Sequence, residues 1–485
     1  MFKLTEDKLG SVTPRRNSET PESALTGITN SCECNFARSI AVSIGMIRLH
    51  FNDPRSVRRS TSGIGWVLRY QGFLVGTLLF VGVSLSFAEP RFPFPQHVAY
   101  TAGVLKPTHV SQAAMDAAVV RHYKAWQSHY VKSLVDSDPV QMWIKYDKTD
   151  STVSEAMGYG MVLAAYMGDQ AELDAMFYYV KAHPSSIGKN LLAWKQKLKN
   201  GVMKNVQGQD SATDGDMDVA YAMILADQQW GSSGSINYRD QALLILADIM
   251  TYCVNPTDWN LLMGDWASEN DTTHSRPSDF MVDHLLAFAA FDTVRADRWM
   301  KVYDRITETV NHQFSNGSDT TGLMADFYVK DGSHFVPVTG KYLESPHDGD
   351  YSYNSCRTPW RLPMAYILSG KSDIRRSQQK MAEWIALKTE NDPSKIRAGY
   401  FVQNGANGAA FVDYDDLAFT APFAVNAMLG GNQEWLNKLW SSITGGGAPL
   451  AVDYYGDAIR LQVLLVVSGN WWLPTKAVGE ERTRK

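Results

Sequence analysis

Hydrophobic positions between about Val110 and Val467 recur at the spacing of helices that bury one face. This pattern predicts twelve helices, with ends placed to within about 2–4 residues: 110–134, 153–167, 171–182, 215–230, 237–253, 277–291, 296–313, 357–369, 373–388, 415–428, 432–443 and 456–469. Short turns such as 168–170 join the even-numbered helices to the next, and longer segments follow the odd-numbered ones. The first and last helices are left to pair, which favours a closed ring of helical hairpins.

The long connections of such a ring all lie at one end. Long loops on a rigid scaffold are where sites are usually built. Several polar residues open even-numbered helices and are therefore expected to meet at that end, namely Glu155, Asp214, Arg276 and Arg357. No fixed-period repeat accompanies the pattern, which favours a ring over a solenoid.

The most acidic helix start is ATDGDMDVA at 212–220, with three carboxylates in five residues. Asp216 and Asp218 fit the ordinary role of complementing the helix dipole, and Thr213 or Asp214 that of a cap. Asp214 also precedes Gly215, whose freedom at positive φ would let its carboxylate point away from its own helix.

Two motifs carry a resemblance to a known family. The run 212–231, ATDGDMDVAYAMILADQQWG, resembles the signature of glycoside hydrolase family 8, and 154–161, SEAMGYGM, resembles its second motif. The similarity extends from about Pro95 to Pro474. It implies an all-α (α/α)6 barrel, in agreement with the alternating loop lengths. Neither CxxC nor HExxH occurs, so we predict no metal site and no cofactor.

Hydrolysis of a glycosidic bond needs a protonated carboxyl at the leaving oxygen and a second group that activates water. By composition alone, Ser154 and Glu155 would simply start a helix. The resemblance implies that Glu155 is the proton donor, and its apolar, glycine-containing surroundings would raise its pKa.

The general base is harder to place. The larger branch of the family has a carboxylate where YSYNSCR at 351–357 has Asn354, and an amide cannot take a proton from water. The run KYLES at 341–345 resembles an inserted loop of a second branch, where a glutamate is the base, so we assign this role to Glu344. Asp348 and Asp350 are rivals, and a solvated acidic loop would explain all three.

The resemblance also implies supporting roles. Asp214 would hold a sugar hydroxyl, while Arg357 and Tyr353 would orient Asn354 and the water; Arg357 is alternatively a structural ion pair. Aromatic rings in long connections are typical platforms for sugars. The expected substrate-binding residues are Trp194, Trp259, Trp266, Tyr159 and Asp216.

The first 88 residues are predicted to be a leader. Phe73–Phe87 is an apolar run of 15 residues, and Ser86 and Ala88 are small, which predicts a signal peptide cleaved after Ala88 and a secreted or periplasmic protein. The run is short for a bilayer span of about 20 residues, although an uncleaved anchor is the alternative. Translation from Met46 instead of Met1 would explain the long segment ahead of it. Residues 89–485 are then a single catalytic domain.

Beyond residue 88 the formal net charge is −9. A mildly acidic protein argues against a nucleic-acid partner and suits neutral or cationic substrates. The resemblance implies an inverting endo-hydrolase of β-1,4 links in β-glucan, and we expect it to be a monomer without stable membrane association after cleavage. Chitosan is the alternative substrate because Asp348 and Asp350 would attract its positive charge. A non-catalytic glucan-binding barrel is a second alternative, raised by Asn354.

Overall fold

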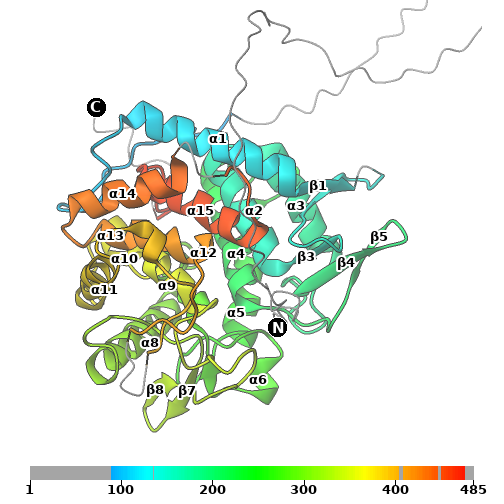
Figure 1. The fold of residues 1–485 in the computed structure, drawn as a ribbon. Helices are drawn as coiled ribbons and strands as arrows, with labels where there is room; N and C mark the ends of the chain where they lie inside the picture. Colours follow the sequence, from blue (N-terminus) through cyan, green and yellow to red (C-terminus); the bar gives the residue numbers. More distant parts are fainter. Residues whose placement is uncertain (1–88, 135, 403–407, 446–448, 476–485) are drawn as a thin grey trace, which may run out of the picture. The chain divides into compact units, whose positions relative to one another are not determined.

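The computed structural model describes residues 89–475 except 135, 403–407 and 446–448. Six helical segments form an inner ring (Figure 1): α2 (Ser154–Met167), α4 (Thr213–Trp230), α7 (Val282–Phe291), α9 (Thr358–Arg361) with α10 (Met364–Ser369), α12 (Leu417–Thr420) with α13 (Pro422–Ala427), and α15 (Tyr454–Val467). Each contacts the next in this order, and α15 returns to α2. The ring is therefore closed, as the (α/α)6 prediction requires.

Six further helices pack outside this ring: α1 (Gln112–Tyr130), α3 (Gln170–Ala182), α5 (Tyr238–Tyr252), α8 (Ala296–Asn316), α11 (Arg375–Lys388) and α14 (Gln433–Thr444). Composition explains the two layers. In α2, 13 of 14 residues are buried, whereas in α8 only 8 of 21 are. A helix that is apolar all round needs neighbours on every side, and an amphipathic one needs them on one side. Helices α1 and α15 pack together, as predicted.

All twelve predicted helices occur, with local differences. Pro363 separates α9 from α10, and Pro422 begins α13 after a break, because proline has no N–H to donate within a helix. The first helix ends at Tyr130 instead of 134. The sixth begins with a 3₁₀ turn at Pro277–Asp279, and two more 3₁₀ turns lie at Ser355–Arg357 and Pro393–Lys395. A short helix, α6 (Ala267–Asn270), was not predicted.

Three small antiparallel sheets in the long connections were also not predicted. They pair β1 (Val131–Leu134) with β2 (Gln141–Ile144); β4 (Lys195–Lys199) with both β3 (Ser151–Val153) and β5 (Val202–Asn205); and β7 (Tyr328–Asp331) with both β6 (His274–Ser275) and β8 (His334–Pro337). The β4–β5 hairpin projects from the body of the protein (Figure 1). Strand β3 leads directly into α2 and so places Glu155.

Within the described ranges, no helix is both long and apolar enough to span a bilayer. The apolar run 73–87, the cleavage site after Ala88 and both candidate start residues, Met1 and Met46, lie outside the described residues.

Candidate active site

Helices α2 and α4 approach closely at their first turns because both carry glycine there. A Cβ on Gly215 would lie 2.4 Å from the carbonyl carbon of Ser154, and one on Gly158 would lie 2.7 Å from Cβ of Asp218. The prediction of a positive φ at Gly215 was wrong, since it lies inside α4 and is not among the left-handed residues. The absence of a side chain on Gly215 lets the two helices approach, and this approach brings Glu155 and Asp214 together.

The expected cap at this helix is also absent. Helix α4 begins at Thr213, whose hydroxyl donates to the carbonyl of Leu262 at 2.5 Å, and Ala212 occupies the cap position without a side-chain hydrogen bond. Thr213 therefore ties the helix start to a neighbouring loop.

Arg357 joins three of the predicted site residues. Its Nη1 donates to Oε2 of Glu155 at 2.7 Å and to Oδ2 of Asp214 at 3.1 Å. Its Nη2 donates to Oδ1 of Asn354 at 3.2 Å. Arg357 is therefore a buried ion-pair centre around which the acid, the positioning aspartate and the amide are arranged.

Glu155 is suited to donating a proton near neutral pH. Burial raises its pKa to about 7; Arg357 opposes this rise, and the charge of Asp214 adds to it. The hydroxyl of Tyr454 donates to Oε1 at 3.1 Å. A carboxyl that is half protonated at this pH matches the demands on a general acid.

Asp214 is in the opposite state. Burial alone would raise its pKa, but Arg276 and Arg357 outweigh burial and hold the pKa below its usual value. Nη2 of Arg276 lies 3.2 Å from Oδ1 of Asp214 and 3.0 Å from Oδ1 of Asp279. An ionised carboxylate therefore lies beside one that still holds a proton half of the time near neutral pH.

Glu344 faces this group from the other side of Asn354. Nδ2 of Asn354 donates to Oε2 of Glu344 at 3.1 Å, and Oε1 has no hydrogen-bond partner among the described residues. Burial raises the pKa of Glu344, and Arg276 opposes the rise. Oε1 is therefore a buried oxygen whose hydrogen bond the described residues do not supply.

The two rival acids are engaged in holding the loop. Asp348 accepts four backbone N–H groups, from residues 342–345, at 2.6–2.9 Å. Asp350 accepts the N–H of Val402 at 3.1 Å and lies 3.0 Å from Nδ1 of His347. These contacts favour Glu344 as the base among the three, and they show how Asp348 positions it.

The sequence also matches a family of known proteins. The family described as Glycosyl hydrolases family 8 matches residues 92–469. The chain belongs to glycoside hydrolase family 8. It is therefore an O-glycosyl hydrolase, and the family resemblance is confirmed.

Relatives of this family 8 enzyme include a β-glucanase of Niallia circulans, 43% identical over 401 residues, which are 81% of this chain and 94% of that protein. An endoglucanase of Bacillus sp. strain KSM-330 is 36% identical over 80% of this chain and 83% of its own length. The apo structure of a β-1,3-1,4-glucanase from Paenibacillus sp. X4 has a TM-score of 0.74 at 42% identity, over 79% of this chain and 100% of that one. A cold-adapted family 8 xylanase, at 20% identity and a TM-score of 0.63, shares the fold.

Tyr353 was expected to orient Asn354 and the water, but its hydroxyl is bound elsewhere. The hydroxyl donates to Oδ2 of Asp416 at 3.0 Å, while the Tyr353 carbonyl accepts the hydroxyl of Tyr455 at 2.6 Å. The Tyr455 ring lies 5.6 Å from the guanidinium carbon of Arg357. Tyr353 thus acts on the site through Tyr455.

The turn that carries Asn354 is held by a residue that sequence reasoning missed. Asp326 accepts the N–H groups of Ser352, Asn354 and Ser355 at 2.7–3.1 Å, and the Ser355 hydroxyl at 2.6 Å. Tyr454, whose hydroxyl donates to Glu155, was missed as well. Asp326 and Tyr454 stand in no recognised motif, and their contacts come from distant parts of the chain. Arg276 was predicted to lie at this end of the ring, and it contacts Asp214 there.

The predicted tryptophan platforms lie in different settings. Trp194 is 8% exposed and its indole donates to the carbonyl of Gln207 at 2.7 Å. Trp259 is partly buried, with the ammonium of Lys301 4.7 Å from its ring. Trp266 packs against the small cluster of Met263, Phe327 and Val338, against which Tyr342 and Leu343 of the Glu344 loop also pack. Trp266 therefore shares its packing with the loop that carries the proposed base.

Tyr159 and Asp216 make contacts within the protein. The hydroxyl of Tyr159 lies 3.4 Å from Nη1 of Arg357, and Oδ1 of Asp216 accepts the N–H of Leu192 at 3.0 Å. Both side chains are almost fully buried. Their contacts make them supports of Arg357 and of the Leu192 backbone, and do not point to sugar binding.

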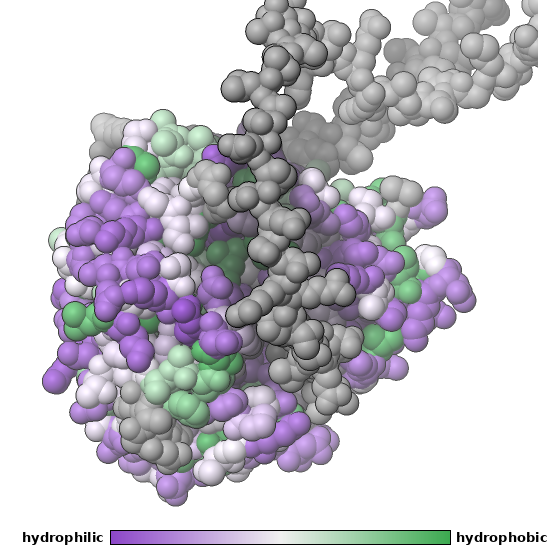
Figure 2. Space-filling view, in the orientation of Figure 1, coloured by the Kyte–Doolittle hydropathy of each residue, from purple (hydrophilic) through white to green (hydrophobic). Residues whose placement is uncertain are grey.

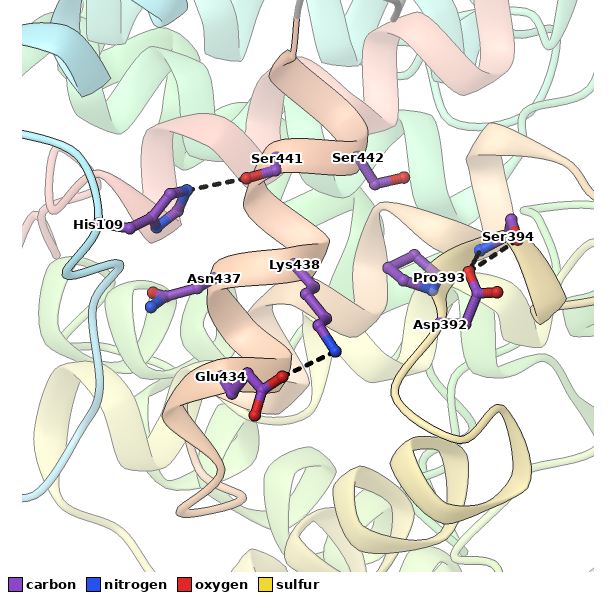
Figure 3. A pocket seen from close by; sticks show the side chains of 9 residues that line it. All are labelled: His109, Asp392, Pro393, Ser394, Glu434, Asn437, Lys438, Ser441 and Ser442. Carbon is purple, nitrogen blue, oxygen red and sulfur yellow. Dashed lines mark hydrogen bonds and ion pairs between the residues drawn. The ribbon is translucent and has the colours of Figure 1, made fainter.

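A pocket of about 540 Å³ lies elsewhere, along α14 (Figure 3). Its polar side chains already pair with one another: Lys438 with Glu434 at 2.8 Å, and His109 with Ser441 at 2.8 Å. It is lined by none of the predicted site residues and by no tryptophan, tyrosine or phenylalanine, so it does not have the lining of a sugar site.

Proposed function

We propose that this protein is an inverting endo-β-1,4-glucanase that acts on β-glucan. The observation that carries the proposal is the pair of carboxyls on either side of the Arg357–Asn354 bridge, with the pKa of Glu155 raised to about 7 and Glu344 hydrogen-bonded to Asn354. The β-glucanase and endoglucanase relatives support the substrate class. The same geometry argues against the non-catalytic alternative, because Glu344 takes the place of the carboxylate that Asn354 lacks.

In this mechanism Glu155 gives its proton to the leaving glycosidic oxygen. Glu344 takes a proton from water at its free Oε1, and the water attacks the anomeric carbon from the face opposite the leaving group. Asn354 fixes the other oxygen of Glu344, and the ionised Asp214 accepts a hydrogen bond from a sugar hydroxyl. Solvent then returns a proton to Glu155 and removes one from Glu344. A guanidinium and an amide separate the two carboxyls, so that they do not contact each other directly, as an inverting mechanism with an intervening water requires.

The chitosan alternative loses its main support in this arrangement. Asp348 is saturated by four backbone N–H groups, and Asp350 is bonded to Val402 and His347. Both carboxylates are thus engaged within the loop and neither is placed to contact an ammonium group directly, so β-glucan is the substrate that we favour.

The test measures reducing ends released by the purified protein from barley β-glucan, carboxymethylcellulose, chitosan and xylan. We expect activity on β-glucan, a product whose anomer is inverted by NMR, and a loss of about 10²-fold or more in Glu344→Gln. Asp331→Asn, an exposed change at the β7–β8 turn, should leave the rate unchanged. Undiminished activity in Glu344→Gln would refute the assignment of the base, and binding without any turnover would support the inactive barrel.

We also propose that the protein is exported and acts as a monomer. The apolar run 73–87 and the small residues before Glu89 support export. N-terminal sequencing of the exported protein should begin at Glu89, and light scattering should give the mass of one chain. A retained leader would instead favour the anchored alternative.

A further inference from the structure

One face of the β4–β5 hairpin carries a row of lysines. Because side chains alternate along a strand, Lys195, Lys197 and Lys199 point to the same face of β4, and Lys204 stands directly opposite Lys197 on β5. The other face is turned inward, since Gln196 and Met203 are buried. The lysine row, defined as these four residues, lies on the projecting hairpin (Figure 1), over which Figure 2 shows mainly hydrophilic side chains.

The lysine row is poorly balanced by acids. The hairpin 195–205 contains no aspartate or glutamate, and none of the four lysines forms an ion pair within the described part of the chain. Asp147 is the acid that acts on Lys195, and Asp150 pairs instead with Lys145. Like charges directly opposite each other in a sheet are destabilising. The Lys197–Lys204 pair therefore destabilises the hairpin, and a hairpin with a purely structural role would not need such a pair.

Two tyrosine rings connect Glu155 with the first residue of the lysine row. The hydroxyl of Tyr454 donates to Glu155, and the Tyr454 ring packs edge-on against Tyr146 with centroids 6.2 Å apart. The ammonium of Lys195 lies 5.4 Å from the Tyr146 ring. Tyr146 is partly exposed, so a ring suited to stacking on a sugar lies between Glu155 and the lysines. A polymer that passes Glu155 on this side meets Tyr146 first and then the positive charges.

We propose that the lysine row is a subsite for acidic substituents, so that the enzyme prefers β-glucan chains that carry carboxylate groups. Tyr146 would stack on a sugar ring, and Lys197, Lys199 and Lys204 would attract the carboxylates of the units beyond it. The proposal rests on the proposed glucanase function and adds a charge preference to it. It also reverses the expectation, drawn from the overall negative charge, that the substrate is neutral or cationic, because charge near the site acts more strongly than net charge.

The test compares the enzyme with Lys197→Gln/Lys204→Gln on carboxymethylcellulose and on neutral hydroxyethylcellulose. We expect KM for the carboxymethylated polymer to rise about 3- to 10-fold, as the loss of two exposed charge contacts predicts, with kcat unchanged and KM for the neutral polymer within about twofold. Added salt should raise KM in the same selective way for the native enzyme. The control Lys124→Gln/Lys380→Gln makes the same charge change on the outer helices α1 and α11 and should have no effect.

A binding measurement keeps the two proposals distinguishable. Retardation of the Glu155→Gln protein in gels that contain each polymer reports binding without turnover. Selective retardation by carboxymethylcellulose, lost in Lys197→Gln/Lys204→Gln, supports the subsite even if the native protein were inactive. Equal effects on both polymers, no effect of the lysine changes, or stronger retardation by DNA than by the glucan would overturn it. Activity on neutral β-glucan together with any of these results would leave the glucanase function intact.

Discussion

At the scale of single residues, two neighbouring carboxyl groups have opposite pKa shifts. Glu155 and Asp214 are both buried carboxyls that share Nη1 of Arg357. Burial raises the pKa of Glu155 to about 7 and Arg276 opposes this only weakly, whereas Arg276 contacts Asp214 directly and, with Arg357, keeps the pKa of Asp214 low. A difference of one arginine contact thus separates a proton donor from a permanent anion.

This coupling predicts a pH shift in Asp214→Asn. Glu155 holds its proton below about pH 7 and loses it as the pH rises, so kcat/KM should fall above about pH 7. The charge of Asp214 contributes to that raised pKa, and its removal should move the alkaline limb of the pH profile to lower pH, along with a loss of overall rate. Steady-state kinetics across pH 5–9 test this. Asp319→Asn, which is exposed, should keep the native profile, and an unmoved limb in Asp214→Asn would mean that another group sets it.

At the scale of elements, the site depends on how closely two inner helices approach. Gly158 on α2 and Gly215 on α4 leave no room for a side chain between the first turns. Since Glu155 and Asp214 lie on those turns, the helix separation sets the distance between the acid and its neighbouring anion.

Gly215→Ala should therefore damage both stability and activity. Alanine favours a helix over glycine by roughly 1 kcal/mol, but its Cβ would lie 2.4 Å from the Ser154 backbone, so the helices must separate. We expect a lower Tm and a loss of about 10-fold or more in kcat, since small misplacements of catalytic groups are costly. Gly234→Ala, with nothing within 4 Å, is the matched control. A Gly215→Ala enzyme with native Tm and kcat would show that the close approach is not needed.

At the scale of the whole molecule, a buried charge network ties the inner ring together below the site. Asp218 on α4 accepts from Nε2 of His284 on α7 at 2.9 Å and from Nη2 of Arg361 on α9 at 2.8 Å. His284 also contacts Asp283, which accepts the indole of Trp471 at 3.2 Å. Asp218 was predicted to complement its helix dipole, and it instead connects three inner helices.

The network predicts a pH-dependent contribution to stability. Burial alone would lower the pKa of His284, but Asp283 and Asp218 outweigh it and raise the pKa above 6.5. Its ionic contribution is therefore complete below about pH 6.5 and declines as the pH rises through the raised pKa. His284→Gln should lower the free energy of unfolding by about 3–5 kcal/mol at pH 6, and by less at pH 9. Denaturant titrations at both pH values, with exposed His129→Gln as control, test this; a deficit that is equal at both would exclude a charged His284.

The sequence by itself determined the helices and the two residues at their starts. Helical hydrogen bonds join residues four apart, so the period is visible locally, and it placed Glu155 and Asp214 at the same end of a closed ring. Glu344 could be named only through its motif, and its preference over Asp348 came from the backbone contacts of the folded loop. The sheets, the roles of Asp326 and Tyr454, and the contact of Arg276 with Asp214 were decided by tertiary structure. Their partners are remote, as in the hydrogen bond from Tyr454 to Glu155 across 299 residues, and no local pattern records a contact that exists only after the ring has closed.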